Sequence, residues 1–303
     1  MKKTSETIVF FGSGPVAAAS LGHLSEVFSI EAVITKARAA HHRVAAPVEI
    51  LASTKDLPLL FANTRQELDE LLEKTNLKSR VGVIVDFGVI VSQGAIDHFE
   101  LGIINSHFSL LPEWRGADPI TFAVLSGQPK TGVSLMLIEP TLDTGKILTQ
   151  KSLPITPKDT TPTLTDKLIN LSNLLLAEYL PQYLEGSVKP RSQPHPDRAT
   201  YSRKLTKEDG TINWDKSAAE LEREIRAYAE WPRSRTMLDN KEVIVVAAHV
   251  VPGNNDKPGA ISIDEKRSKI TVATGKDSLQ IDILQPAGKK AMTAQAFLLG
   301  NLK

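Results

Sequence analysis

Asn105 and His107 are the residues of this chain whose types and spacing best suit catalysis. They stand two positions apart at the end of an apolar run, residues 102–105, that predicts a β-strand, so both side chains should point to the same side of the backbone. An amide can stabilise the oxyanion of a tetrahedral intermediate, and an imidazole can move a proton at neutral pH. The pair therefore suits acyl transfer, although an Asn-x-His triplet by itself is more often structural.

Asp143 is a third candidate for the same site. It lies in a turn that follows the next predicted strand, residues 132–138, and we expect it at the same edge of the sheet as His107. A carboxylate at that place could orient the imidazole and stabilise its cationic form. The alternative is a plain turn or cap residue, which the local Asp-Thr-Gly sequence alone would favour.

These residues must be positioned by alternating strands and helices. Apolar, β-branched runs at residues 7–11, 30–34 and 81–85 predict buried strands, and residues 65–74 predict a helix. Further strands are expected at residues 132–138 and 147–153, and a leucine-striped helix is expected to end at Gly186. The alternation predicts a parallel sheet covered by helices, in which ligands bind at the carboxyl ends of the strands. Asn105 stands at such an end.

The length of 303 residues, with 41% apolar and 23% charged residues, predicts about two globular domains. Residues 188–206 are rich in proline and in cations, so we expect a linker without regular structure there. The linker would separate a first domain, residues 1–187, from a second domain, residues 207–303. The first domain is expected to be an α/β, Rossmann-like parallel-sheet domain.

The second domain is expected to be a small β-barrel of the oligonucleotide-binding type. Ser217 and Glu220 form the sequence pattern of a capping box, which predicts the start of a helix. Short strands at even spacing follow that helix and favour a barrel; they are residues 242–251, 259–264, 270–273 and 279–284.

Composition excludes several kinds of site. The chain has no cysteine, which excludes disulfides, thiolate nucleophiles and thiolate metal sites. His41 and His42 are adjacent rather than at ligand spacing, so no metal site is expected. The beginning of the chain lacks the apolar stretch of a signal peptide, and no segment approaches the ~20 apolar residues of a membrane span. We expect a cytoplasmic protein that does not contact membranes.

The net charge of +1 conceals an asymmetry between the two halves. Residues 1–187 hold 16 Lys and Arg against 20 Asp and Glu, whereas residues 188–303 hold 20 against 15. The second half therefore has the greater preference for a polyanion. A random split of surface charge would account for the same numbers.

The sequence around Asn105 resembles the signature of the folate-dependent formyltransferases. The resemblance consists of Asn105-Ser106-His107, residues 109–112, residues 114–117 and, further along, residues 142–145. It implies that Asn105, His107 and Asp143 are catalytic, that 10-formyltetrahydrofolate is the formyl donor, and that no metal takes part. It also assigns the binding of this folate to two loops, with the residues Phe87, Gly88, Val89, Ile90, Ser109, Leu110, Leu111 and Pro112.

Within this family, the second half resembles the members that formylate methionyl initiator tRNA for translation initiation. The resembling segments are residues 207–214, 225–227 and 231–232. The resemblance implies initiator methionyl-tRNA as the partner. We also expect the protein to be a monomer. The basic residues expected to contact the tRNA are Lys36, Arg38, Arg43, Lys189, Arg191, Arg203 and Lys204.

The chain departs from the family pattern at several positions. Ser92 stands where proline is usual, and Asp86 stands where a small residue is common. The basic insert after the second predicted strand, which in the family reaches toward the tRNA, is short and retains Lys36, Arg38 and Arg43.

Three alternatives remain open. The acceptor of the formyl group could be a sugar nucleotide or another small amine, and such enzymes would need the second half for no chemistry. A dinucleotide-dependent oxidoreductase would fit Gly12, Gly14 and Ala17 after a strand, but it calls for an acidic residue where this chain has Thr35 and Lys36. The third alternative is an idle RNA-binding module, with few aromatic residues to stack bases.

Overall fold

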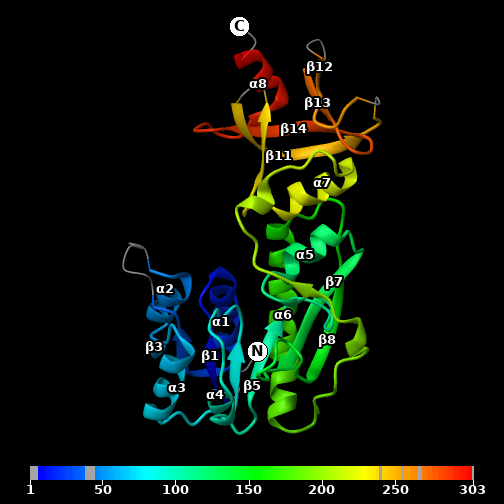
Figure 1. Cartoon of the computed structure of the whole chain (residues 1–303). Coiled ribbons are helices and arrows are strands. Elements are labelled where there is room, and N and C mark those ends of the chain that lie inside the picture. Colours follow the sequence, from blue (N-terminus) through cyan, green and yellow to red (C-terminus); the bar gives the residue numbers. More distant parts are fainter. Residues whose placement is uncertain (1–5, 38–44, 239–240, 254–255, 265–267, 302–303) are drawn as a thin grey trace. The chain divides into compact units, whose positions relative to one another are not determined.

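The computed structural model describes residues 6–37, 45–238, 241–253, 256–264 and 268–301 (Figure 1). The chain divides into two compact units. The first comprises Met1–Gly116, Thr131–Leu153 and Thr165–Tyr201, and the second comprises Ala117–Lys130, Pro154–Leu164 and Ser202–Lys303. None of the helices in the described ranges is both long and apolar enough to cross a lipid bilayer.

The first unit contains a seven-stranded sheet in the order β3-β2-β1-β4-β5-β7-β8. Its strands are β1 (Thr7–Phe11), β2 (Ser29–Thr35), β3 (Leu59–Phe61), β4 (Gly82–Ile84), β5 (Ile103–His107), β7 (Lys130–Leu137) and β8 (Ile147–Pro154). Neighbouring strands from β3 to β5 run parallel, and β7 runs antiparallel to β5. The predicted α/β fold class, with a mostly parallel sheet, is confirmed.

Burial explains why these segments form strands. Ile8, Val9, Phe10 and Phe11 in β1 are all 0% exposed, so the strand is covered on both faces, as parallel strands with continuous apolar runs are. The β1 strand coincides with the predicted residues 7–11. The other predicted strands agree within a few residues, which is the usual uncertainty at strand ends.

The helices of this unit begin where the sequence supplies N-terminal signals. They are α1 (Pro15–Val27), α2 (Pro47–Thr54), α3 (Arg65–Lys74) and α4 (Gln93–Asp97), followed later by α6 (Thr161–Leu184), which continues from the second unit. Helices α1 and α2 have proline in their first turn, where the missing N–H is no loss. Helix α3 is capped by the Thr64 side chain, which accepts a hydrogen bond from Glu67 N at 3.2 Å.

The second unit contains an antiparallel sheet in the order β10-β11-β14-β13-β12, with β15 paired to β14. Its elements are α5 (Pro119–Ser126), α7 (Ala218–Ala227), β10 (Ser234–Leu238), β11 (Lys241–Val251), β12 (Ile261–Asp264), β13 (Lys269–Ala273), β14 (Ser278–Pro286), β15 (Met292–Thr293) and α8 (Ala294–Asn301). The second domain was expected to be a small β-barrel of short strands, and an antiparallel β domain is confirmed.

Helix α7 packs its apolar side into the core of this sheet. Leu221 and Ile225 are buried together with Val245 and Ile281 of the strands. The predicted capping box begins the helix: Ser217 accepts from Glu220 N, and the Glu220 carboxylate accepts from Ser217 N at 2.9 Å. This local prediction is confirmed because all the groups it needs lie within four residues.

The expected absence of regular structure in residues 188–206 is wrong. The segment contains a 3₁₀ helix, Pro196–Arg198, and the short strand β9, Tyr201–Ser202. Pro196 occupies the first helical position, where its fixed φ favours the helix. Thr200 pairs with a distant part of the first unit: its N–H donates to Pro112 O at 3.2 Å, and its carbonyl accepts from Arg115 N at 2.9 Å.

The proposed boundaries at 187 and 206 stay a prediction. The compact units group the chain differently, because residues up to Tyr201 belong to the first unit and Ala117–Lys130 belongs to the second.

Candidate active site

The carboxyl ends of three neighbouring strands meet at one edge of the sheet. Phe11 of β1 pairs with Ile84 of β4, and Ile84 pairs in turn with Asn105 of β5. The turn after β1, the loop after β4 and the end of β5 are therefore adjacent. The strand order changes direction between β1 and β4, which is where open α/β sheets bind ligands.

Asn105 and His107 point to the same side of β5. Ser106, between them, is on the opposite side, where its hydroxyl shares a 2.7 Å hydrogen bond with the Ser172 hydroxyl of α6. The alternation of a strand then places Asn105 and His107 together. Asn105 is half-buried, and within the described part of the chain its side-chain amide has no hydrogen-bond partner. The amide is therefore free to bind an oxygen atom brought by a ligand.

The His107 imidazole is buried, with 6% exposure, and both of its nitrogens face oxygen atoms. Nε2 lies 3.0 Å from the carbonyl oxygen of Trp114. Because a carbonyl oxygen only accepts, Nε2 carries hydrogen and donates. Nδ1 lies 3.9 Å from Asp143 Oδ2, so in the neutral ring its lone pair faces the carboxylate. A proton taken up at Nδ1 would form an ion pair with Asp143.

The Asp143 carboxylate is fixed by a backbone donor. Gly116 N donates to Asp143 Oδ2 at 2.7 Å, and the Asp143 backbone has a left-handed φ of 50°. The loop returns through Gly145, where a Cβ atom would lie 1.8 Å from Leu137 O. Only glycine fits at that position. The structure thus brings the three predicted catalytic residues together, and their catalytic roles remain a proposal.

The predicted folate loop after β4 lies at the same edge of the sheet. Phe87 packs edge-on against Phe11, with ring centroids 5.6 Å apart, and Val89 is buried in the core beneath. Gly88 and Ile90 are exposed, Ile90 to 74%. Two of the four residues therefore anchor the loop, and the other two are open to solvent.

The second predicted folate loop, residues 109–112, is held from below. Ser134 Oγ donates to Ser109 O at 2.6 Å and accepts from Leu111 N at 3.1 Å. Gln150 Nε2 donates to Leu111 O at 2.8 Å. Ser109, Leu111 and Pro112 are buried and Leu110 is half-buried, so Leu110 is the residue of this loop that is most open to a ligand. No local sequence pattern pointed to Ser134 or Gln150, which come from β7 and β8.

Two departures from the family pattern have structural explanations. Ser92 caps α4 by accepting from Ala95 N at 2.9 Å, and its hydroxyl donates to Asp69. Asp86 has a left-handed φ of 50°, and its carboxylate occupies space that Gly14 leaves open, because a Cβ atom there would lie 2.3 Å from Asp86 Oδ2. Both residues therefore fit without disturbing Asn105 or His107.

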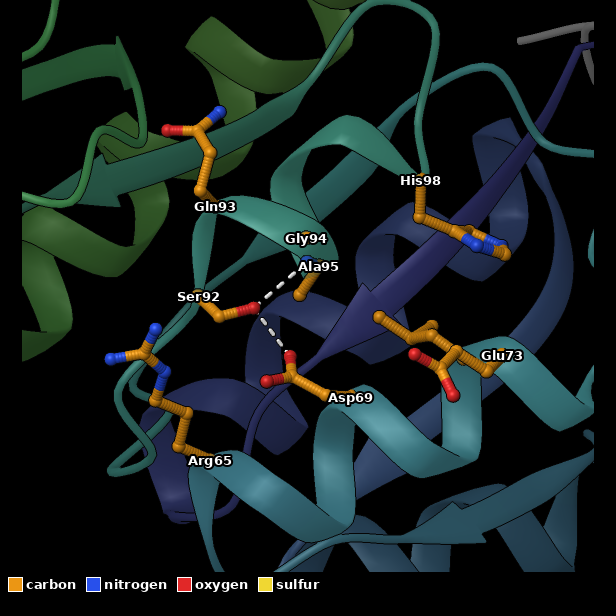
Figure 2. A pocket seen from close by; sticks show the side chains of 9 residues that line it. Arg65, Asp69, Glu73, Ser92, Gln93, Gly94, Ala95 and His98 are labelled. Carbon is orange, nitrogen blue, oxygen red and sulfur yellow. Dashed lines mark hydrogen bonds between the residues drawn. The ribbon is translucent and has the colours of Figure 1, made fainter.

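A hollow of about 250 Å³ lies between α3 and α4. Figure 2 shows side chains that line it, with Ser92 directed toward Asp69 and Ala95. Its lining comprises Arg65, Asp69, Leu72, Glu73, Ser92, Gln93, Gly94, Ala95 and His98. None of the three predicted catalytic residues lines it. Throughout the described ranges, no cluster of three or more His, Asp or Glu has an arrangement that could hold a metal ion.

The basic residues expected to contact tRNA have different surroundings. Lys189 and Arg191 are exposed and line a second hollow of about 540 Å³ beside β8 and α6. Arg203 is engaged, since its guanidinium donates to both Asp209 carboxylate oxygens at 2.8 and 2.5 Å. Lys204 is exposed, and the half-buried Lys36 lies beside Gly88. Arg38 and Arg43 lie outside the described residues.

Two models of known protein families match this chain, one after the other along the sequence. Residues 7–180 match the formyl transferase family, and residues 204–302 match the formyl transferase C-terminal domain. The chain belongs to the formyl transferase family. Gly12 accordingly serves a close turn, because a Cβ atom there would lie 2.5 Å from Ala17 Cβ and 2.7 Å from Val85 O. The oxidoreductase and idle-module alternatives are set aside.

Several solved structures share the fold of this formyltransferase. One is an N-formyltransferase from Helicobacter canadensis in complex with folinic acid and dTDP-3-aminofucose: it is 18% identical, with 92% of this chain and 98% of that chain covered, at a TM-score of 0.69. Another is WlaRD, a sugar 3N-formyl transferase. It is 20% identical, with 95% of this chain and 100% of that chain covered, at a TM-score of 0.69. HypX from Aquifex aeolicus with tetrahydrofolic acid is 16% identical, with 99% and 48% covered, at a TM-score of 0.66.

These matches correct one expectation about the second half. We expected the second half to distinguish the two acceptors, because a sugar-nucleotide enzyme would need it for no chemistry. However, the two sugar-type enzymes match nearly the whole of this chain and nearly the whole of their own. The presence of a second domain therefore does not identify the acceptor.

Proposed function

We propose that this formyltransferase moves the formyl group of 10-formyltetrahydrofolate to a primary amine. The observation that carries the proposal is the free Asn105 amide beside the buried His107, whose Nδ1 faces Asp143 at 3.9 Å. The folate donor is supported by two of the similar structures, which hold folinic acid and tetrahydrofolic acid. The exposed Gly88 and Ile90 offer a loop for it at the same sheet edge.

The chemistry balances with these three residues. The amine lone pair forms a bond to the formyl carbon, and the carbonyl electron pair moves to the oxygen, where the Asn105 amide donates a hydrogen bond to the oxyanion. His107 takes the proton that the attacking amine loses, and Asp143 stabilises the resulting cation. When the intermediate collapses, the bond from carbon to N10 breaks and N10 receives the proton. One formamide and one tetrahydrofolate result.

For the acceptor, we propose the amino group of methionyl initiator tRNA. The proposal is supported by the resemblance of residues 207–214 and 231–232 to the tRNA-formylating members of the family. It is also supported by the hollow that Lys189 and Arg191 line, where two exposed cations suit phosphate groups. In addition, basic residues outnumber acidic residues after residue 187, and this positive charge favours the binding of a polyanion such as tRNA.

The second candidate acceptor is an amino sugar carried by a nucleotide. The similar structures favour it, because two of them are a sugar 3N-formyl transferase and an N-formyltransferase with dTDP-3-aminofucose, and both match this chain over nearly its whole length. Because these two enzymes are only 18 and 20% identical to this chain, the likeness establishes a shared fold and does not establish the acceptor.

One assay separates the two acceptors. The full chain is incubated with 10-formyltetrahydrofolate and, in parallel, with methionyl initiator tRNA, methionyl elongator tRNA and dTDP-linked amino sugars. We expect formylated methionine to appear with the initiator tRNA at a kcat/KM far above that for any sugar. Faster formylation of an amino sugar would replace the tRNA proposal. Absence of formyl transfer to every amine would refute the function itself.

A further inference from the structure

The Asp143 loop is held by a side chain from a distant part of the sequence. Gln193 is buried, and its Nε2 donates hydrogen bonds to Asp143 O at 2.7 Å and to Gly145 O at 3.0 Å. Its Oε1 accepts from Arg115 Nη2 at 2.7 Å. One amide thus uses both of its ends, two donors toward the Asp143 loop and an acceptor toward Arg115.

Arg115 lies between the two backbone groups that contact the proposed catalytic side chains. The carbonyl of Trp114 accepts from His107 Nε2, and Gly116 N donates to Asp143 Oδ2. Gln193 therefore joins the segment that orients the imidazole to the loop that carries the carboxylate. The hydrogen bonds of Gln193 go to the backbone of the Asp143 loop and to Arg115, and not to the side chains of His107 or Asp143.

The backbone at Asp143 also needs support. Its φ of 50° is a left-handed conformation, which costs free energy in a residue other than glycine. Such a conformation persists when neighbouring groups determine it. The two hydrogen bonds from Gln193 are directed at the carbonyls of Asp143 and of Gly145, two residues further on.

We propose that Gln193 is a positioning residue of formyl transfer, which holds the Asp143 carboxylate at the distance from His107 that proton movement requires. This inference rests on the proposed function and adds to it a residue that touches no reacting atom. Positioning acts on the chemical step rather than on the binding of either substrate. Its loss should therefore appear in kcat.

Gln193→Glu tests the N–H donors of the side-chain amide independently of its oxygen acceptor. The carboxylate keeps an acceptor for Arg115 and strengthens that contact by its charge. It loses both donors toward Asp143 O and Gly145 O and places an oxygen against two carbonyl oxygens. Gln193→Ala removes both ends. A role limited to binding Arg115 would be impaired only in the second variant, whereas the proposed role is impaired in both.

Gln182→Glu is the matched control. Gln182 Nε2 also donates to a backbone carbonyl, that of Glu178 within α6, at 2.9 Å. The same change of amide to carboxylate is thus made where no catalytic loop is involved. We expect its kcat to equal that of the wild type, although its thermal midpoint should fall slightly because a negative charge is added near the end of a helix.

The experiment measures steady-state kinetics of the full chain for the wild type, the three variants, Asp143→Asn, and the double variant of Gln193→Glu with Asp143→Asn. We expect Gln193→Glu to lower kcat about tenfold to a hundredfold and to leave both KM values within about twofold. In the Asp143→Asn background the same change should alter kcat less than about twofold, because Gln193 acts through Asp143.

A second readout does not depend on turnover. The imidazole NMR signals of His107, assigned by their absence in His107→Gln, should move in Gln193→Glu and stay in place in Gln182→Glu. Unmoved signals would overturn the inference even if no formyl transfer were detected.

The kinetic outcomes keep this inference apart from the proposed function. Full activity of Asp143→Asn would refute the catalytic assignment itself. A slow Asp143→Asn enzyme combined with an unimpaired Gln193→Glu would refute the positioning role alone. The positioning role would also be refuted if the reductions in kcat of the two single variants multiplied in the double variant. An effect of Gln193→Glu confined to KM would refute it too.

Discussion

Nδ1 of His107 and Oδ2 of Asp143 stand 3.9 Å apart, too far for a hydrogen bond and close enough for an ion pair once the imidazole is protonated. On the other side of the ring, Nε2 is already committed to Trp114 O at 3.0 Å. The imidazole is therefore fixed at one nitrogen and can exchange a proton at the other.

Asn105→Ala should lower kcat by about a hundredfold to a thousandfold, the usual effect of losing one oxyanion donor. Because the amide has no hydrogen-bond partner among the described residues, the free energy of unfolding should change little. The measurements are kcat, the folate KM and a denaturant titration. A rise in the folate KM with unchanged kcat would make Asn105 a binding residue instead.

His107→Gln should reduce kcat by about a hundredfold to ten-thousandfold, since a general acid or base is lost. Glutamine tests this buried position more specifically than a small side chain would. Its Nε2 can still donate to Trp114 O, and its side chain fills most of the space of the imidazole. Circular dichroism should report an unchanged fold. A variant that retains wild-type kcat would remove His107 from the mechanism.

Asp209 should make the stability of the second unit sensitive to acid. The hydrogen bonds from the Arg203 guanidinium hold the pKa of the Asp209 carboxyl well below its usual range, with a backbone donor, Thr206 N, adding to the effect. A lowered folded-state pKa stabilises the fold above the unfolded pKa of about 3.9, and that contribution is lost as pH falls further.

Asp209→Asn should therefore lose stability at neutral pH and show a weaker decline between about pH 5 and pH 2 than the wild type does. The measurement is the denaturant midpoint across that pH range. Asp215→Asn, a nearby exposed carboxylate, serves as the control. Parallel curves for Asp209→Asn and the wild type would contradict the prediction.

Binding of tRNA should weaken with salt, because Lys and Arg side chains release counterions from the phosphates. Neutralising Lys189 and Arg191 should flatten the logarithmic salt dependence by up to about one unit per contact. Neutralising Arg203 and Lys204 should flatten it less, since Arg203 is already bonded to Asp209. The measurement is a tRNA titration at several salt concentrations for the wild type and both double variants.

The opposite order of the two double variants would move the tRNA surface away from the hollow beside β8. Neutralising Lys36, Arg38 and Arg43 tests the insert in the same way, and we expect a smaller effect. A wild type without any salt slope would favour the small amino sugar as acceptor.

The sequence by itself determined the local structure that carries the first two catalytic candidates. Asn105 and His107 share a side because strand alternation is a property of neighbouring residues, and the Ser106–Ser172 contact agrees with it. The strand at residues 7–11, the helix at residues 65–74 and the Ser217 capping box were predictable for the same reason. Each depends on groups only a few positions apart.

The tertiary structure alone decided how Asp143 reaches His107. We expected the turn after residues 132–138 at the same edge as His107, but β7 runs antiparallel to β5, so strand direction does not place it there. The contact instead depends on Gly116 N, on the glycine at 145 and on Gln193 from the segment expected to be an unstructured linker. Periodicity records which face of its own element a residue occupies. It carries no information on which distant segment will supply a hydrogen-bond partner, since that depends on packing of the whole unit.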